Sequence, residues 1–304
     1  MIRGVYCASA SPLNVDLSPD LGAFVAHAQA LLSDGCDGIA LLGTTGEANS
    51  FSLAERRAIL EAVVEGVGPD RLMPGTGVNA LPETVELTRH ALALGVTRVV
   101  MLPPSYYKGV SDEGLFRAYA RVIETVGDDR LQLVLYHIPQ VSGVPIGHEL
   151  IKRLVTEFPG TVVGIKDSAG KIDNMAEMIA RFPGFAVLAG ADPLLLPLMR
   201  MGGAGCITAT SNLVADSLAT VFRGHSDPSR KAEVEAAQAR INAYRELSVA
   251  YVQIPAIKAM VAFRHGATLW TRTRPPLVDM SPAQLADLKD RLRAIGANPS
   301  DLAA

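Results

Sequence analysis

Lys166, Tyr136 and the segment Gly43-Thr44-Thr45-Gly46-Glu47 are the residues of this chain whose types and positions could support chemistry on a carbonyl compound. Lys166 and Tyr136 each end a short apolar run, and the glycine- and threonine-containing segment follows another. A lysine held away from water favours its neutral amine, which can attack a ketone and form a Schiff base. Asp167 leaves a simpler interpretation open, in which Lys166 is only an ion-paired strand end.

A Schiff-base mechanism on a 2-oxo acid also needs a group that holds the carboxylate and a group that moves protons. Threonine hydroxyls and backbone amides of residues 43–47 could bind a carboxylate, because glycine lets the backbone approach closely. The phenol of Tyr136 could carry protons. The alternatives are an ordinary turn for the first segment and packing at a strand end for Tyr136. Lys258 is the rival amine, but it falls in a helical pattern, and we expect it to lie along the surface with its charge in water.

The pattern of apolar runs predicts the elements that would position these side chains. Short runs rich in β-branched residues alternate with helical patterns, and their starts lie about 20 to 35 residues apart, which fits a strand, a helix and two loops per unit. This alternation favours a parallel sheet covered by helices. Eight units favour a closed (β/α)8 TIM barrel over an open doubly wound sheet. The strands are expected at Gly4–Ala8, Gly38–Leu42, Leu72–Gly75, Arg98–Leu102, Gln132–His137, Val162–Lys166, Ala186–Ala189 and Gly205–Thr208.

Helix signals support the same division of the chain. Ser52 and Glu55 form a capping box before apolar residues at helical spacing, and Gly68-Pro69 ends that helix. Further helices are expected at 82–94 and 111–126. The residues after the last strand predict a C-terminal helical extension with helices at 229–250, 254–265 and 281–295. We therefore expect a barrel over residues 1–224 and an extension over residues 225–304, with the candidate site at the C-terminal ends of the strands.

Composition excludes several other classes of protein. Twenty-eight basic and thirty-one acidic residues leave a net charge of −3, which argues against a nucleic-acid partner. Cys7, Cys36 and Cys206 lack metal-ligand spacing and are expected to be buried thiols, and the histidines lack the spacing of a zinc site. No apolar run is long enough to span a membrane, and the first residues do not resemble a signal peptide. We expect a cytoplasmic protein with no membrane partner and no metal.

Together these motifs resemble the signatures of the dihydrodipicolinate synthase / N-acetylneuraminate lyase family. Members of that family are Schiff-base class I aldolases and dehydratases that act on pyruvate or 2-keto-3-deoxy acids. Besides residues 43–47, the matching segments are Tyr136-His137-Ile138-Pro139, Gly164-Ile165-Lys166-Asp167-Ser168, Pro104-Ser105-Tyr106-Tyr107 with Ser111-Asp112-Glu113-Gly114-Leu115 after it, and Met201-Gly202-Gly203-Ala204-Gly205.

The resemblance implies roles for the matching residues. Lys166 would form the imine with the C2 carbonyl of the substrate, which makes C3 acidic and yields an enamine. Tyr136 would be the general acid and base. Thr44 and Thr45 would bind the carboxylate, with Thr45 also in the proton relay. The further substrate-binding positions that the resemblance implies are Gly46, Val141, Gly190 and Ile207.

The resemblance also implies an assembly. Tyr107 resembles a tyrosine that reaches across a dimer interface and completes the relay of the neighbouring subunit, although the adjacent Tyr106 could face inward instead. The family is commonly a homotetramer built as a dimer of dimers, and it implies no metal or organic cofactor. The expected partners are pyruvate or another 2-oxo acid, together with an aldehyde.

Departures from the family pattern narrow the activity. Synthases that make dihydrodipicolinate carry an arginine at the position of Val141, where it holds the carboxylate of aspartate semialdehyde. Valine offers no paired donors for a carboxylate, so this synthase is the disfavoured alternative. Pro193 follows Asp192 where sialate lyases have a glutamate, and Ala209 stands where they have a serine. His137 replaces the asparagine that is common at its position.

We therefore expect a lyase that cleaves or forms 2-keto-3-deoxy or 4-hydroxy-2-oxo acids as an aldolase, or dehydrates them. Two alternatives to a lyase also remain open for the function of this chain. One is a non-catalytic barrel that keeps the pocket for ligand binding. The other is a phosphate-binding barrel that uses the glycine-rich segment 201–205.

Overall fold

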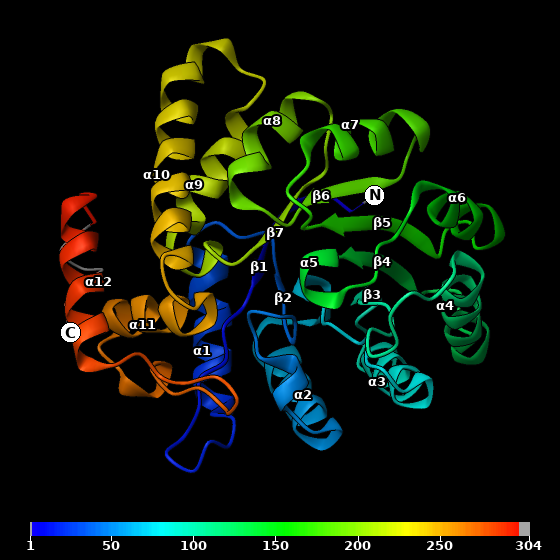
Figure 1. Cartoon of the computed structure of the whole chain (residues 1–304), viewed down its shortest axis with the longest axis horizontal. Helices are drawn as coiled ribbons and strands as arrows, with labels where there is room; N and C mark the ends of the chain where they lie inside the picture. Colours follow the sequence, from blue (N-terminus) through cyan, green and yellow to red (C-terminus); the bar gives the residue numbers. More distant parts are fainter. Residues whose placement is uncertain (1, 298–304) are drawn as a thin grey trace.

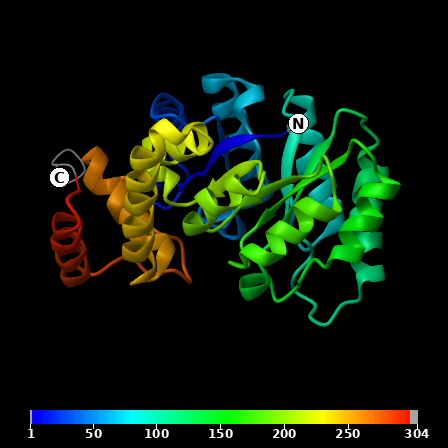
Figure 2. The same ribbon diagram turned by 90° about the horizontal axis from the view of Figure 1, so that it is seen from above.

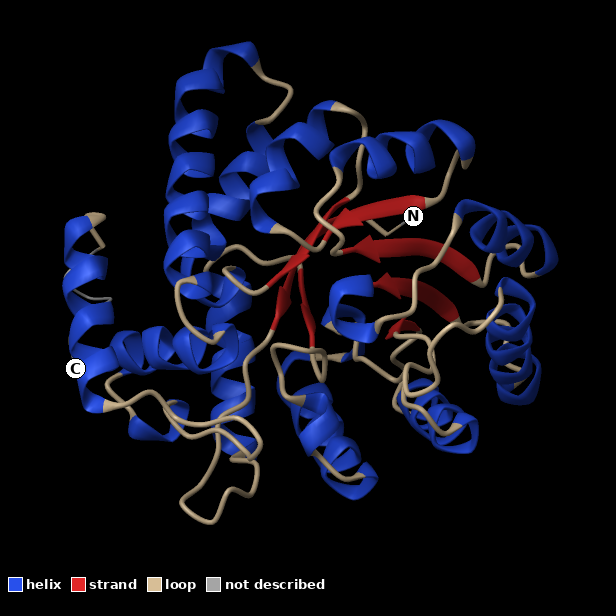
Figure 3. Ribbon diagram, viewed as in Figure 1, coloured by secondary structure: helices blue, strands red, loops and turns tan. Residues whose placement is uncertain are grey.

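Seven short parallel strands lie at the centre of the molecule, with helices packed around them (Figures 1 and 3). This computed structural model describes residues 2–297. The strands are rich in apolar side chains because a parallel sheet is covered on both faces. Across the sheet they follow the order β2-β1-β7-β6-β5-β4-β3. Their bounds are β1 Gly4–Ala8, β2 Gly38–Ala40, β3 Arg98–Met101, β4 Gln132–His137, β5 Val162–Asp167, β6 Ala186–Ala189 and β7 Gly205–Thr208.

The predicted strand Leu72–Gly75 is wrong as a regular strand, although the segment occupies the eighth position of the barrel. It connects β2 to β3 only through isolated bridges from Leu72 to Ile39 and from Gly75 to Val100. Pro74 explains the interruption, because it has no N–H to donate on the side that faces β3. Its carbonyl still accepts a hydrogen bond from Val100 N at 2.9 Å. The segment thus closes the ring, and the (β/α)8 fold is confirmed.

Three predicted strand ends also shift. β2 ends at Ala40 rather than Leu42, because Leu42 adopts a φ of +56° that no extended strand allows. β3 ends at Met101, one residue early, and β5 runs one residue further, to Asp167. The early turn after β2 matters because residues 43–47 leave the barrel there.

The helices between the strands confirm the predicted start and stop signals. The capping box of Ser52 and Glu55 is formed at the start of α2, and Gly68 caps its end. Ser111 caps α4 by accepting a hydrogen bond from Gly114 N, and Gly127 ends that helix at a φ of +61°. The helices of the barrel are α1 Leu21–Ser33, α2 Leu53–Val67, α3 Leu81–Ala93, α4 Asp112–Val126, α5 Pro139–Ser142, α6 His148–Glu157, α7 Ile172–Arg181, α8 Leu195–Arg200 and α9 Ser211–Gly224.

Two buried clusters make up the core. The larger lies between the strands and the surrounding helices. The smaller fills the barrel and includes side chains that alternate with those of the larger cluster along each strand, as the two-residue period of a strand requires. Its members include Tyr6, Ala8, Met73, Val100, Val134, Tyr136, Leu188 and Ile207. The presence of Met73 shows that the irregular eighth segment is part of the barrel wall.

Up to residue 297, the predicted extension forms three α-helices, α10 Lys231–Val249, α11 Gln253–His265 and α12 Pro282–Ala294. α10 packs along α9, and α12 lies furthest from the barrel (Figures 1 and 2). The chain between α11 and α12 returns to the barrel, where Leu269 O accepts a hydrogen bond from Leu13 N at 3.1 Å. The division of the chain at residue 224 stays a prediction, but the extension makes specific contacts with the barrel.

The three cysteines Cys7, Cys36 and Cys206 are free and buried, as expected. Burial raises the pKa of the Cys7 and Cys206 thiols.

Within residues 2–297, no single helix is both long and apolar enough to cross a membrane. Only the strongly bent pair Pro228–Val249 and Gln253–His265 reaches that length and composition.

Candidate active site

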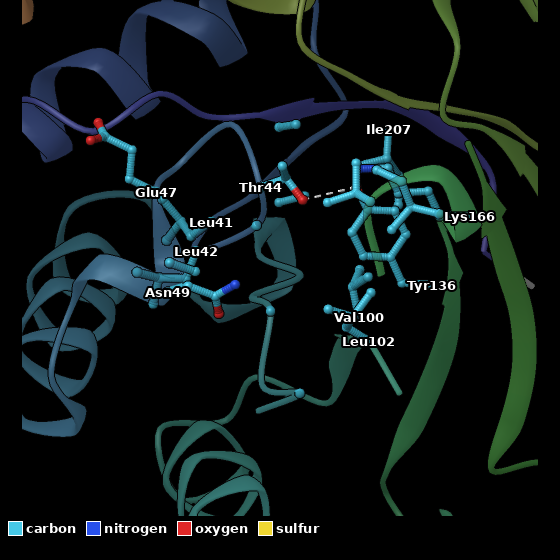
Figure 4. A pocket seen from close by; sticks show the side chains of 18 of the residues that line it. Leu41, Leu42, Thr44, Glu47, Asn49, Val100, Leu102, Tyr136, Lys166 and Ile207 are labelled. Carbon is cyan, nitrogen blue, oxygen red and sulfur yellow. Dashed lines mark hydrogen bonds between the residues drawn. The ribbon is translucent and has the colours of Figure 1, made fainter. Parts of the chain in front are cut away.

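A cavity of about 260 Å³ opens at the C-terminal ends of the strands. Its lining includes five of the predicted site residues: Thr44, Tyr136, Lys166 and Ile207, which Figure 4 labels, and Val141. The remaining predicted residues, Thr45, Gly46, Tyr107 and Gly190, are not part of this lining.

Lys166 reaches the cavity because of its register in the barrel. It lies opposite Tyr136 where β5 pairs with β4, and successive strand residues point to opposite faces. Lys166 is only 6% exposed, and its Nζ lies 4.2 Å from the centre of the Tyr136 ring. Among the described residues, no carboxylate forms an ion pair with this amine.

The simpler interpretation, that Asp167 pairs with Lys166, does not hold. The Asp167 carboxylate accepts hydrogen bonds from Ala169 N at 2.8 Å and from Asn174 Nδ2 at 2.7 Å. Its side chain is fully buried on the other face of β5 from Lys166. The carboxylate therefore fixes the loop after the strand and leaves the lysine amine to the cavity.

Tyr136 is linked to the residue that follows Gly43. Its hydroxyl forms a hydrogen bond of 3.2 Å with Thr44 Oγ1 (Figure 4). Burial alone would raise the pKa of the Tyr136 phenol, but the neighbouring charge of Lys166 and the hydrogen bond with Thr44 outweigh it and leave this pKa below its ordinary value. A phenol with a lowered pKa beside an amine is suited to proton transfer.

The turn after β2 determines which threonine faces the cavity. Thr44 lines the cavity, whereas Thr45 is half-buried outside that lining. Gly46 is tightly packed, because a Cβ there would lie 2.9 Å from Ser9 O, and its carbonyl accepts a hydrogen bond from Ser11 Oγ at 2.8 Å. Gly46 thus supports the turn through its backbone rather than through the cavity.

The other predicted residues lie at the edges of the site. Val141 is at the rim and 64% exposed, and Ile207 is buried in the wall. Tyr107 is 73% exposed, and its ring contacts that of Tyr106 at 5.3 Å between centres. A Cβ at Gly190 would lie 1.9 Å from Ser168 Oγ, so glycine at this position leaves room for the side chain two residues beyond Lys166.

Lys258 was expected at the surface, and this expectation is wrong. Its side chain is completely buried and its Nζ lies 2.5 Å from Glu47 Oε1, which is equally buried. Burial lowers the pKa of Lys258, although the charge of Glu47 opposes the shift. The residues around Lys258 in α11 are apolar on every side of the helix, which is typical of a buried helix and was the available signal.

Arg274, in the segment that returns from the extension, contacts Glu47 at this end of the cavity, and no sequence pattern predicted it. Its backbone N–H donates to Glu47 Oε2 at 3.1 Å. Its guanidinium donates to Leu17 O, Ser50 O and the Glu55 carboxylate, and it lowers the pKa of Glu55 to about 2. The extension thus holds the turn that carries Thr44. Ile254 and Leu277 of the extension line the cavity as well.

Asp192, which was compared with a sialate-binding residue, does not line the cavity. It is fully buried and accepts hydrogen bonds from the backbone N–H and the hydroxyl of Thr210.

The glycine-rich segment 201–205 leads into the N-terminal end of β7, whereas Lys166 lies near the C-terminal end of β5, at the opposite end of the barrel. A Cβ at Gly205 would lie 1.9 Å from Gly4 O, so this glycine permits close strand packing, and the phosphate-cradle interpretation is wrong.

The fold and the cavity define a barrel enzyme whose lysine projects from a strand end, and comparisons with known proteins identify the family. The model of the dihydrodipicolinate synthetase family matches residues 1–295. The chain is 33% identical to an uncharacterised DapA-like lyase of Chloroflexus aurantiacus, over 94% of this chain and 95% of the relative. It is 32% identical to the 4-hydroxy-tetrahydrodipicolinate synthase of Synechocystis sp., over 97% and 96% of the two chains.

A solved structure gives the same result. The crystal structure of dihydrodipicolinate synthase from Agrobacterium tumefaciens superimposes with a TM-score of 0.87 at 31% identity, over 96% of this chain and 99% of that one. The chain therefore belongs to the dihydrodipicolinate synthetase family and is a lyase. The predicted family is confirmed. Among the described residues, no group of three or more His, Cys, Asp or Glu side chains is placed to hold a metal ion.

Proposed function

We propose that the protein is a Schiff-base aldolase or dehydratase that acts on pyruvate and on 2-keto-3-deoxy or 4-hydroxy-2-oxo acids. The observation that carries this proposal is the Lys166 amine, which is buried at the cavity without a carboxylate partner among the described residues. Such an amine, once neutral, adds to the C2 carbonyl of a 2-oxo acid, and loss of water gives the imine. The names of two relatives, a DapA-like lyase and a 4-hydroxy-tetrahydrodipicolinate synthase, support a lyase.

The position of Tyr136 supports its role as acid and base. The protonated imine draws electrons from C3, so the phenolate can remove a C3 proton and leave an enamine. In the aldol direction, C3 of the enamine attacks the aldehyde carbon, and the new alkoxide takes its proton from the Tyr136 phenol. Water then hydrolyses the imine and releases the product and the free Lys166 amine. In the dehydratase variant, the enamine expels a hydroxyl group, which leaves as water once protonated.

We assign the substrate carboxylate to the hydroxyl and backbone N–H of Thr44, the threonine of this turn that lines the cavity where the chain leaves β2. The hydrogen bond between Thr44 and Tyr136 supports Thr44 as the relay partner of the phenol. This differs from the sequence-based expectation, which gave the relay role to Thr45. Exposed Tyr107 suits a relay completed by a second copy of the chain, as in a homotetramer built as a dimer of dimers.

Synthesis of dihydrodipicolinate remains the less favoured activity. It requires a cationic side chain for the carboxylate of aspartate semialdehyde, and Val141 stands at the rim of the cavity instead. A charge-assisted hydrogen bond is worth roughly 1.5–3 kcal/mol, so its loss weakens binding of that aldehyde. If Val141→Arg fails to improve turnover of aspartate semialdehyde, this use of position 141 is wrong.

Exchange of the methyl protons of pyruvate in D2O tests the proposal without requiring the aldehyde. An enamine formed through an imine makes these protons exchange quickly at neutral pH, and proton NMR follows their loss. We expect enzyme-dependent exchange in the wild type and none above the uncatalysed rate in Lys166→Met. Equal exchange in both proteins, or none in a folded wild type, would contradict the proposal.

A further inference from the structure

We propose that the aldehyde partner of this lyase carries an uncharged, mainly apolar tail, such as an aryl or branched alkyl group. This inference rests on the proposed function, because it concerns the part of the same cavity that lies beyond the imine. The argument comes from the cavity walls, from the state of their charged groups and from the hydrogen bonds of their polar groups.

Many of the residues that form the walls beyond Lys166 and Tyr136 are apolar. Val100 and Leu102 lie beside the Tyr136 ring (Figure 4). The rest of this surface comes from segments that are far apart in the sequence, including the extension. These further lining residues are Ile138, Val141, Ile254 and Leu277.

The charged groups of the cavity already have partners within the protein or a role in imine formation. Of the described residues in its lining, only Lys166 is cationic and only Glu47 carries a carboxylate. Lys166 is needed for the imine, and both Glu47 oxygens are bonded, one to Lys258 and one to Arg274 N. A charged tail would therefore lose water without gaining an opposite charge.

A lysine near the rim does not change this conclusion. The Lys108 ammonium donates to Ser105 O and to Ser142 O at 2.6 Å. Both serines line the cavity, but Lys108 itself does not. Lys108 joins the loop after β3 to α5, and its ammonium is hydrogen-bonded to backbone carbonyls.

Several polar side chains of the lining are also engaged within the protein. The Ser142 hydroxyl donates to Val144 O and accepts from Val144 N, both at 3.1 Å. Ser105 contacts Asn79 Oδ1 through its backbone N–H and its hydroxyl. A polyol tail requires a partner for each buried hydroxyl, and the lining leaves Asn49 and the Ser50 hydroxyl to supply them.

The size of the cavity agrees with such a tail. Its volume of about 260 Å³ lies just below the range for ligand pockets, roughly 300–1,000 Å³. It exceeds the needs of a three-carbon acid and leaves room for one ring or a short branched chain. Burial of apolar atoms against apolar walls favours that occupant.

The test compares kcat/KM for condensation of pyruvate with four aldehydes: benzaldehyde, isobutyraldehyde, D-glyceraldehyde and aspartate semialdehyde. We expect the better of the first two to exceed both the polyol and the charged aldehyde at least tenfold. The opposite preference would overturn the inference. Pyruvate methyl exchange is measured on the same samples, so an enzyme that exchanges protons but prefers a charged or polyol tail contradicts only this inference. Absence of exchange contradicts the proposed function as well.

A pair of variants localises the effect. Val141→Arg places a cation on the apolar rim, and we expect it to shift the kcat/KM ratio of aspartate semialdehyde to benzaldehyde upward by tenfold or more. Val249→Arg makes the same substitution on a half-exposed residue at the end of α10, and it is expected to leave this ratio as in the wild type. If both variants shift the ratio equally, or neither does, the apolar rim does not select the aldehyde. Exchange rates of both variants separate altered selection from lost imine chemistry.

Discussion

Lys166 and Lys258 are both buried, yet one faces a cavity and the other faces a carboxylate. Lys166 projects from β5 toward the ring of Tyr136. Lys258 lies in α11, and its ammonium contacts Glu47. Removal from water acts on both amines, so burial alone does not distinguish a nucleophile from a structural charge. The distinction lies in what the protein places next to each nitrogen.

This difference divides the site into a reactive end and a fixed end. At the fixed end, Lys258 and Arg274 bind the two oxygens of Glu47 and hold a residue whose φ is +51°. At the reactive end, Thr44 lies on the same turn and contacts Tyr136. The ion pair of the fixed end therefore positions the relay of the reactive end, and the following predictions test this division.

The largest effect is expected from loss of the reactive amine. Lys166→Met removes the only group proposed to form the imine, so pyruvate exchange should fall to the uncatalysed rate, as measured by NMR in D2O. Lys171→Met is the matched control, since Lys171 is exposed at the start of α7, and it should keep wild-type exchange. Residual enzyme-dependent exchange in Lys166→Met would mean that another amine reacts.

The next effect concerns the proton relay. Tyr136→Phe should slow pyruvate exchange by roughly 10²–10⁴-fold while the imine still forms. Because the pKa of Tyr136 is below its ordinary value of 10.0, the wild-type rate should rise with pH through an ionisation below that value, and the rise should be absent in the variant. An unchanged pH–rate profile in Tyr136→Phe would remove Tyr136 from the relay.

Breaking the fixed end should lower the free energy of unfolding. Glu47→Gln leaves the Lys258 ammonium buried without its partner, which typically costs about 3–5 kcal/mol. Urea unfolding measures this loss. The double variant Glu47→Gln, Lys258→Met should recover much of it, because no buried charge then remains unpaired. A Glu47→Gln variant as stable as the wild type would show that the pair contributes nothing to the fixed end.

The smallest effect is a pH dependence at the edge of the fixed end. The pKa of Glu55 falls from 4.5 to about 2 in the folded protein through its contact with Arg274. A lowered folded pKa stabilises the fold above the unfolded value, and this contribution is lost as the pH falls from 4.5 toward 2. Glu55→Gln keeps the helix cap but has no carboxyl group that ionises in this pH range. The stability advantage of the wild type should therefore shrink over this pH range, and a constant difference in urea midpoint would contradict the assignment.

The sequence was sufficient for the barrel because each strand and helix signal is local. The capping box of Ser52 and the stop at Gly127 depend on neighbouring residues only, and both are present in the structure. Pro74 interrupts a predicted strand through its missing N–H, which is also a local property of the sequence. The position of Lys166 at a strand end also followed from the local pattern.

Other parts of the site depend on contacts that no local pattern contains. Glu47 and Lys258 are 211 positions apart, and only the return of the extension to the barrel brings them together. Which of two adjacent threonines meets Tyr136 is decided by the left-handed turn between Leu42 and Glu47. The wall formed by Leu277 likewise depends on that return, so the cavity could be predicted at its reactive end but not at its fixed end.

Reductive trapping tests the difference between the two lysines most directly. The folded protein is incubated with pyruvate, borohydride is added to reduce any imine, and peptide mass spectrometry locates the adduct. We predict a single reduced pyruvyl adduct on the peptide that contains Lys166 and none on the peptide that contains Lys258. An adduct on Lys258, or no adduct on folded protein, would contradict the assignment of Lys166 as the reactive amine.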